Sequence, residues 1–191
     1  MPSPAIGGLG CDRLDMKFFD TDVVGARRIV LERRTDERGF FARAWCRSEF
    51  AEAGVDVDWV QANAARSTKA GTLRGLHFQR PPFDEVKLVR CTRGAVFDVA
   101  VDLRPDSPTY RGWSGLRLDA DGADAFLIPA GCAHGYLTLT DDVDLYYLTS
   151  TVYEPAAAAG VRYDDPAFGI VWPRAVEVIS AQDATWPGFA L

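Results

Sequence analysis

Two histidines, His77 and His134, are the side chains of this 191-residue chain best suited to proton transfer near neutral pH. An imidazole has an ordinary pKa of about 6.5, so it can act as a general base without a large perturbation. A single histidine in a β protein is more often a hydrogen-bonded structural residue. Here His77 lies in the segment Leu73–Gln79, between a cation and an amide, and His134 follows an apolar run that ends at Ile128. Both are therefore candidates for chemistry.

A lysine and two tyrosines extend this set. By strand parity Lys87 shares a face with Val89 and Cys91, and an ammonium group is costly to bury there unless it has a partner or a task. The alternative is that Lys87 reaches the mouth of a barrel and stays hydrated. Tyr147 and Tyr153 are six residues apart, so an uninterrupted strand places both on one face. Plain aromatic packing is the competing explanation for them.

The histidines form a poor metal site. The segment Pro129–His134 has the Pro-x-Gly-x-x-His spacing and resembles the second motif of the cupin barrels. In metal-binding cupins an earlier strand supplies His-x-His and a glutamate, whereas this chain offers His77 alone, with Glu85 as the nearby carboxylate. Two histidines and one carboxylate are a weak ligand set for a divalent ion, so we expect no metal.

Short strands must position these residues. From Val96 to Leu103 apolar residues alternate with Asp98 and Asp102, which is the period of a β-strand. A brief helix is expected at Arg47–Ala53, and a second is possible near Ala156–Ala159. Many strands with almost no helix predict an all-β fold of closed or sandwiched antiparallel sheets, such as a jelly roll. The other expected strands are Arg28–Glu32, Lys87–Arg93, Ser114–Leu118, Ala125–Ile128, Gly135–Thr140 and Asp144–Tyr153.

Composition narrows the class of protein. With 27 acidic and 21 basic residues the net charge is -6, which argues against nucleic acid or an anionic membrane as partner. No apolar run approaches the ~20 residues that span a bilayer, and the first residues lack a basic segment followed by an apolar one, so we expect no secretion signal. Four scattered cysteines fit reduced thiols, so we expect a cytoplasmic protein. We predict a flexible leader at 1–16, one domain at 17–175 and a C-terminal tail at 176–191.

Six short motifs occur in an order and spacing that resemble the dTDP-4-dehydrorhamnose 3,5-epimerase family, from about Asp36 to Pro173. The resemblance implies a cupin jelly roll that acts on a nucleotide-linked 4-keto-6-deoxyhexose, needs no cofactor and forms a homodimer with exchanged strands, for which Lys17–Val24 is a candidate. The motifs are Asp36-Glu37-Arg38-Gly39-Phe40-Phe41, Leu73-Arg74-Gly75-Leu76-His77, Lys87-Leu88-Val89-Arg90, Gly94-Ala95-Val96-Phe97-Asp98-Val99, Ala133-His134-Gly135 and Asp164-Asp165-Pro166.

The resemblance also implies roles for individual residues. His77 is the base that removes a proton beside the C4 ketone, and Asp165 hydrogen-bonds its imidazole. Lys87 stabilises the enolate, and Tyr147 returns a proton from the opposite face of the sugar. The implied substrate-binding residues are Arg38, Arg74 and Arg162 for the diphosphate, Gln61 and Asn63 for nucleotide or sugar, Phe40 and Tyr153 as flanking rings, and His134 beside the sugar.

The chain departs from the family pattern in places. Arg43 stands where many members carry a glutamate that contacts the nucleotide, and Phe83 and Leu148 replace a histidine and a lysine. Simple alternation puts Arg74 and His77 on opposite strand faces, unless Gly75 permits a bulge. Three alternatives stay open: an epimerase that inverts C3 or C5 alone, a non-catalytic cupin that binds a sugar nucleotide, and a metal-dependent cupin.

Overall fold

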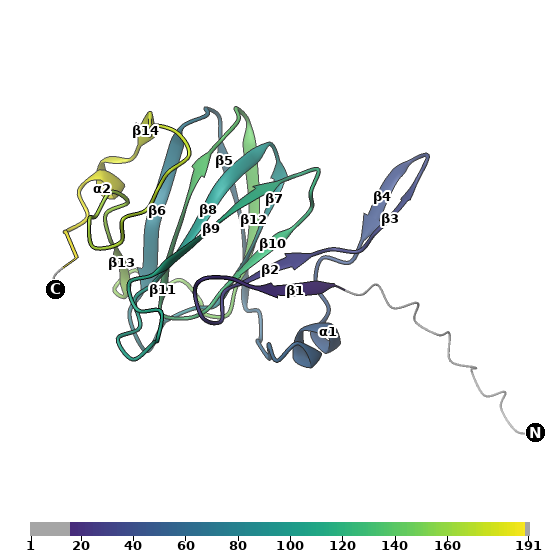
Figure 1. Cartoon of the computed structure of the whole chain (residues 1–191), viewed down its shortest axis with the longest axis horizontal. Coiled ribbons are helices and arrows are strands. Elements are labelled where there is room, and N and C mark those ends of the chain that lie inside the picture. The colour runs from purple at the N-terminus through teal and green to yellow at the C-terminus, as the bar shows by residue number, and fades with distance from the viewer. Residues whose placement is uncertain (1–15, 190–191) are drawn as a thin grey trace, which may run out of the picture.

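Two six-stranded β-sheets pack face to face in the computed structural model, which describes residues 16–189 (Figure 1). The pairings are antiparallel except that β14 lies parallel to β6, so the all-β prediction is confirmed. In spatial order, the first sheet contains β1 (Lys17–Asp20), β2 (Arg27–Val30), β10 (Ala125–Ile128), β7 (Lys87–Arg93), β12 (Val143–Thr149) and β5 (Gln61–Ser67). The second contains β13 (Ala158–Gly160), β6 (Thr72–Gln79), β11 (Cys132–Thr138), β8 (Ala95–Asp102) and β9 (Trp113–Asp119), with β14 (Val178–Ile179) beside β6.

The remaining elements lie outside the two sheets. A hairpin of β3 (Arg33–Asp36) and β4 (Gly39–Ala42) stands away from the body (Figure 1). Helix α1 (Arg47–Glu52) confirms the helix expected there, and α2 (Ala181–Ala184) follows β14. The prediction of a second helix near Ala156–Ala159 is wrong, because Ala158 and Ala159 pair with β6 as part of β13. None of the helices in residues 16–189 is long and apolar enough to cross a membrane.

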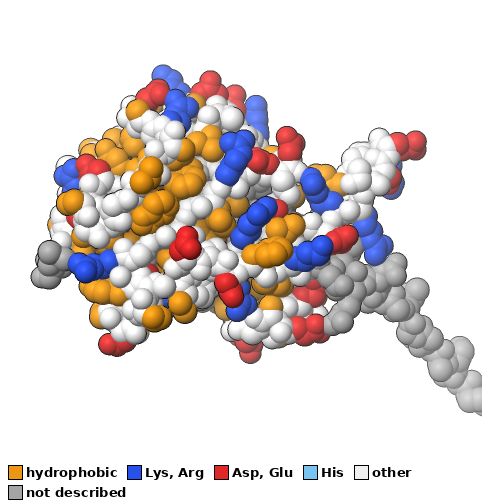
Figure 2. Space-filling model, in the orientation of Figure 1, with side chains coloured by type: hydrophobic (Ala, Val, Ile, Leu, Met, Phe, Trp, Pro, Cys, Tyr) orange, Lys and Arg blue, Asp and Glu red, His pale blue; other side chains and the backbone are white. Residues whose placement is uncertain are grey.

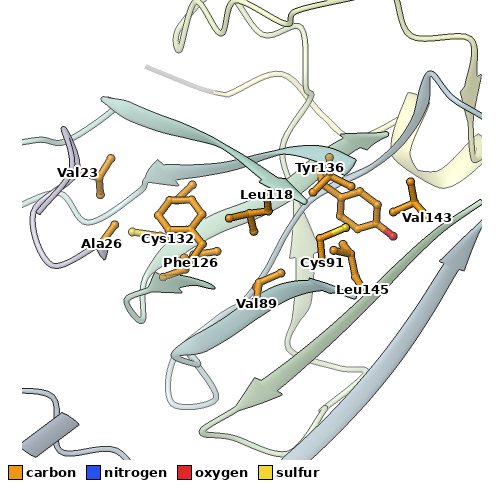
Figure 3. Packing of buried hydrophobic residues seen from close by; sticks show 13 residues of the cluster. Val23, Ala26, Val89, Cys91, Leu118, Phe126, Cys132, Tyr136, Val143 and Leu145 are labelled. Carbon is orange, nitrogen blue, oxygen red and sulfur yellow. The ribbon is translucent and has the colours of Figure 1, made fainter. Parts of the chain in front are cut away.

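The interior between the sheets is apolar along most of its length (Figure 3). Val89 and Cys91 of β7 pack there beside Phe126 and Leu145 of the same sheet and against Leu118 of the opposite sheet. These strands therefore bury one apolar face in the sandwich. A second cluster, around Ile29, Leu88 and Phe50, lies under α1 on the outer side of the first sheet. A third, around Leu76, Val99 and Phe168, lies on the outer side of the second sheet.

The alternation in β8 is confirmed, but its polar face is not exposed to solvent. Val99 and Val101 pack in the outer cluster, while Asp98 and Asp102 are both fully buried. Asp102 accepts hydrogen bonds from Arg104, Ser107 and Thr109, which holds its pKa well below the usual range although burial alone would raise it. Residues after β13 cover the outer face of this strand, which is why both faces are buried. Figure 2 shows hydrophobic side chains gathered over β8 and β9.

The structure describes most of the predicted C-terminal tail but only the last residue of the predicted leader. The leader at 1–16 lies outside the described residues except for Met16, which is buried against α1. The expected tail at 176–191 contains β14 and α2, which pack on β6. Cys46, Cys91 and Cys132 are free thiols, and Cys11 lies outside the described residues.

Candidate active site

A cavity of about 360 Å³ opens between β5, β6, β7 and β12. It contains six of the residues expected from the sequence: Gln61, Asn63, His77, Lys87, Tyr147 and Tyr153. The other lining residues are Phe78, Gln79, Glu85, Thr149, Ala158, Ala159, Gln182 and Trp186. A base, a cation, two phenols and two amides therefore face one space, although they come from segments far apart in the sequence.

A β-bulge in β6 turns His77 toward this space. The pairing of β11 with β6 shifts by one residue, from His134 opposite His77 to Tyr136 opposite Arg74. Gly75 lies within the bulge at φ +133°, and a Cβ there would come within 2.5 Å of the Cα of Gly135. Only glycine tolerates both the backbone angle and the close approach. The bulge expected at Gly75 is confirmed, and Arg74 and His77 both border a neighbouring hollow.

Asp183 is the carboxylate that holds the imidazole. His77 Nε2 lies 2.6 Å from Asp183 Oδ1, and the backbone N–H of Gly75 donates to Asp183 Oδ2 over 3.2 Å. The prediction that Asp165 hydrogen-bonds the His77 imidazole is wrong. Its two carboxylate oxygens accept from the backbone N–H groups of Ala167 and Phe189, so Asp165 fixes the end of the chain instead.

Two opposing effects act on the proton affinity of His77. Burial lowers the pKa of the imidazole, and this effect exceeds the opposite influence of Asp183, while nearby Lys87 and His134 also lower it. The side chain still keeps 45% of its surface exposed. His77 is therefore neutral, accessible and held at Nε2, as a general base must be.

Lys87 is buried with a carboxylate partner rather than hydrated at a barrel mouth. Its Nζ lies 3.1 Å from Glu85 Oε1, and the two side chains are only 9% and 12% exposed. A buried ammonium needs such a partner, because the unpaired charge would be very costly. Glu85 thus keeps a positive charge stable at the wall of the cavity.

Tyr147 faces the cavity from β12, opposite Asn63 of β5. Burial raises the pKa of its phenol, and the negative charge of Glu85 raises it further. Tyr147 consequently keeps its proton at neutral pH and can serve as an acid. Plain aromatic packing does not describe it, because it lines the cavity as well as touching the core.

The amide side chains are fixed at the rim. Gln61 Nε2 donates to Asn63 Oδ1 over 2.9 Å, and Gln61 Oε1 accepts from the backbone N–H of Tyr153. Tyr153 lies beyond the end of β12 and is largely exposed. The expected strand Asp144–Tyr153 is therefore too long, yet Tyr147 and Tyr153 line the same cavity.

Four other expected residues do not line this cavity. Arg38 and Phe40 lie on the exposed β3–β4 hairpin, where Arg38 pairs with its neighbour Asp36. Arg162 pairs with Asp164 near the surface. Arg74 donates to Ser67 Oγ and to the backbone oxygen of Arg66, beside the cavity rather than within it.

Two further residues bind acidic side chains and do not line the cavity. His134 lies opposite His77, but it is buried, and its Nε2 is 2.6 Å from Asp98 Oδ1. Arg43, which replaces the glutamate common at that position, pairs with the buried Glu49 of α1.

Sequence reasoning missed Asp183 as the partner of His77, and it missed Glu85, Gln182 and Trp186 as cavity residues. Asp183 is 106 residues from His77 in the chain and follows no strand pattern. The sequence does contain a signal here, because a serine followed three residues later by an acidic residue is typical of a helix start. In the structure the Ser180 hydroxyl accepts the backbone N–H of Asp183. That signal would have placed a short helix where we expected a tail.

Comparisons with known proteins agree with this geometry. The sequence model of the dTDP-4-dehydrorhamnose 3,5-epimerase family matches residues 20–190. A dTDP-4-dehydrorhamnose 3,5-epimerase of Sinorhizobium fredii is 40% identical over 181 residues, which cover 94% of this chain and 93% of that protein.

Solved structures show the same similarity. A Bacillus anthracis dTDP-4-dehydrorhamnose 3,5-epimerase with TDP and PPi bound has a TM-score of 0.88 at 36% identity, covering 91% of this chain and 99% of that one. A 3'-monoepimerase of Streptomyces bikiniensis in complex with dTDP-quinovose has a TM-score of 0.81 at 36% identity, covering 87% and 84%. The sandwich is thus the cupin-type fold of these enzymes, and the chain belongs to the dTDP-4-dehydrorhamnose 3,5-epimerase family.

Proposed function

We propose that this protein is an epimerase that inverts C3 and C5 of a dTDP-linked 4-keto-6-deoxyhexose in deoxysugar biosynthesis. The observation that carries the proposal is the convergence of His77, Lys87 and Tyr147 on one cavity, with His77 held by Asp183. A protein that only binds a sugar nucleotide has no need of this combination of base, cation and acid.

The reaction starts with proton removal next to the ketone. The C4 carbonyl acidifies the protons on C3 and C5, and neutral His77 takes one of them. Because Asp183 occupies Nε2, Nδ1 is the nitrogen that receives the proton. Asp183 then stabilises the imidazolium that forms. The burial that lowers the pKa of His77 keeps the base neutral beforehand.

Lys87 and Tyr147 complete the inversion. The ammonium group of Lys87 stabilises the negative charge that develops on the C4 oxygen of the enolate. Tyr147 donates its proton to the opposite face of the ring, which inverts the carbon. Its raised pKa fits this role, because an acid must remain protonated until the enolate forms.

We also propose a homodimer in which the β3–β4 hairpin of one protomer brings Arg38 and Phe40 to the cavity of its partner. Phe40 and Phe41 are 50% and 66% exposed, which favours an apolar partner surface over solvent. In the single chain β1 pairs with β2, so the hairpin is the better candidate for exchange. Sedimentation should give a dimer, and Arg38→Ala should weaken dTDP binding without altering Tm.

Deuterium incorporation tests the reaction itself. The protein is incubated with dTDP-4-keto-6-deoxyglucose in heavy water, and the label is located by mass and proton NMR. Label at both C3 and C5 with inverted product supports the proposal. Label at C3 alone would make this chain a single-centre enzyme, a second candidate favoured by its similarity to the 3'-monoepimerase of Streptomyces bikiniensis. No label from a folded protein would contradict both.

A further inference from the structure

Trp186 contacts both members of the His77–Asp183 pair. Its indole Nε1 donates to Asp183 Oδ1 over 3.3 Å, and Oδ1 is also the oxygen that His77 Nε2 approaches to 2.6 Å. The Trp186 ring lies edge-on to His77, with centroids 6.2 Å apart and an interplanar angle of 72°. Trp186 also lines the cavity. One side chain therefore touches the base, its carboxylate and the substrate space.

Gly160 makes room for this indole. In the β13–β6 ladder Gly160 lies opposite His77, and a Cβ on Gly160 would come within 2.2 Å of the Trp186 ring. The φ of Gly160 is not in the left-handed region, so its backbone does not require glycine. What requires glycine is the ring, which rests directly on the main chain of β13. The indole is thereby held in one position next to His77.

We propose that Trp186 is a positioning residue for the reaction, fixing the Asp183 carboxylate against the His77 imidazole through its indole N–H and its ring. The inference rests on the proposed function. With Gly75 N–H on Oδ2 and two donors on Oδ1, the carboxylate cannot rotate without losing a hydrogen bond. The ring meanwhile lies edge-on beside the imidazole and limits its movement on that side.

The contact has a measurable electrostatic consequence. The indole N–H shares Oδ1 with His77, so it withdraws acceptor capacity that would otherwise stabilise the imidazolium. Removing that N–H should raise the pKa of His77. The charged and titratable groups that act on the imidazole are Asp183 from α2, Lys87 from β7 and His134 from β11. Of these three, Asp183 is the group to which Trp186 is hydrogen-bonded.

The test compares Trp186→Phe, which keeps a ring and removes the N–H, with Gly160→Ala, which keeps the indole and displaces it. The matched control is Trp172→Phe, because Trp172 also donates its indole N–H, to the backbone oxygen of Tyr163, but lies away from the cavity. The chain has only two histidines, so NMR of ¹³C-labelled histidine follows His77 with His134 as internal reference. A His77→Asn variant assigns the two signals.

In Trp186→Phe we expect the pKa of His77 to rise by about half a unit and kcat to fall by about three- to tenfold. In the Trp172→Phe control the pKa of His77 and kcat should not change. Gly160→Ala should act in the same direction. The double variant should be no worse than the single ones, since both changes break the same contact.

The titration requires no substrate, so it separates this inference from the proposed function. An unchanged pKa of His77, with kcat within twofold of wild type in both variants, would overturn the role of Trp186 even if wild type epimerises the sugar. A shifted pKa in a protein that exchanges no sugar protons would leave the coupling of Trp186 to His77 intact and contradict the proposed function. If kcat fell equally in the Trp172→Phe control, the loss in Trp186→Phe would reflect general packing and not the positioning of His77.

Discussion

Replacing Asp183 with asparagine removes the charge beside His77 and leaves the shape of the site nearly unchanged. Asp183 Oδ1 lies 2.6 Å from His77 Nε2, and the Asp183 side chain is only 6% exposed. A hydrogen bond to a charged group contributes about 1.5–3 kcal/mol. Since each 1.36 kcal/mol is tenfold in rate, losing that stabilisation of the imidazolium should lower the exchange rate by about 10- to 150-fold.

The asparagine has a second effect in the same direction. Its carboxamide oxygen can still accept the Gly75 N–H, which turns the NH₂ group toward His77 Nε2. The imidazole must then accept at Nε2 and carry its proton on Nδ1, the nitrogen that should receive the substrate's proton. The loss of rate should therefore lie at the upper end of the range.

The assay is single-turnover exchange of the C3 and C5 protons in heavy water, with dTDP affinity measured in parallel. Asp165→Asn is the matched control, because Asp165 binds the backbone of Ala167 and Phe189 and does not touch His77. It should lower Tm and leave exchange nearly unchanged. If Asp165→Asn slowed exchange more than Asp183→Asn, the assignment of Asp183 as the partner of the base would be refuted.

Three further results are expected. Lys87→Met should reduce exchange by about 10²–10³-fold, as for loss of a group that stabilises an oxyanion, with dTDP binding kept; an unchanged rate would exclude Lys87 as the enolate partner. Tyr147→Phe should impair formation of inverted product more than deuterium exchange, whereas equal losses would make Tyr147 a positioning residue. Because the pKa of His77 is lowered from about 6.5 and the neutral form is the base, kcat/KM should remain high as pH falls through 6.5 and decline only at lower pH; a decline that begins above 7 would contradict this.

The sequence predicted well where a short motif fixes local geometry. His77, Lys87 and Tyr147 each lie in a strand whose parity or motif points its side chain inward, and the structure places all three in one cavity. Gly75 could be associated with a bulge because glycine is the residue that a kinked strand favours. These predictions depend on neighbours within a few residues, which the sequence displays directly.

The errors arose where contacts join distant segments. Asp183 and His77 meet only because β14 and α2 return to β6, and nothing in the local pattern of either residue shows this. A recognisable motif favours Asp165 as the partner of His77, yet its carboxylate accepts hydrogen bonds from the backbone. Alternation assigns Asp98 and Asp102 to one face of their strand, but it does not show that this face is buried.

The binding roles predicted for Arg38 and Phe40 are not tested by the structure of a single chain. Both residues lie on an exposed hairpin of the single chain, so the binding role proposed for them depends on the proposed dimer. A pattern in one chain cannot state whether a residue serves its own cavity or that of a partner.

The most direct test of the account is proton exchange in His77→Ala, measured with dTDP binding on the same preparation. Loss of deuterium incorporation at both C3 and C5 by orders of magnitude, with dTDP affinity close to that of wild type, is the result we predict. Exchange at a near-normal rate in this variant would show that another group removes the proton, and the mechanism built on His77 and Asp183 would be wrong.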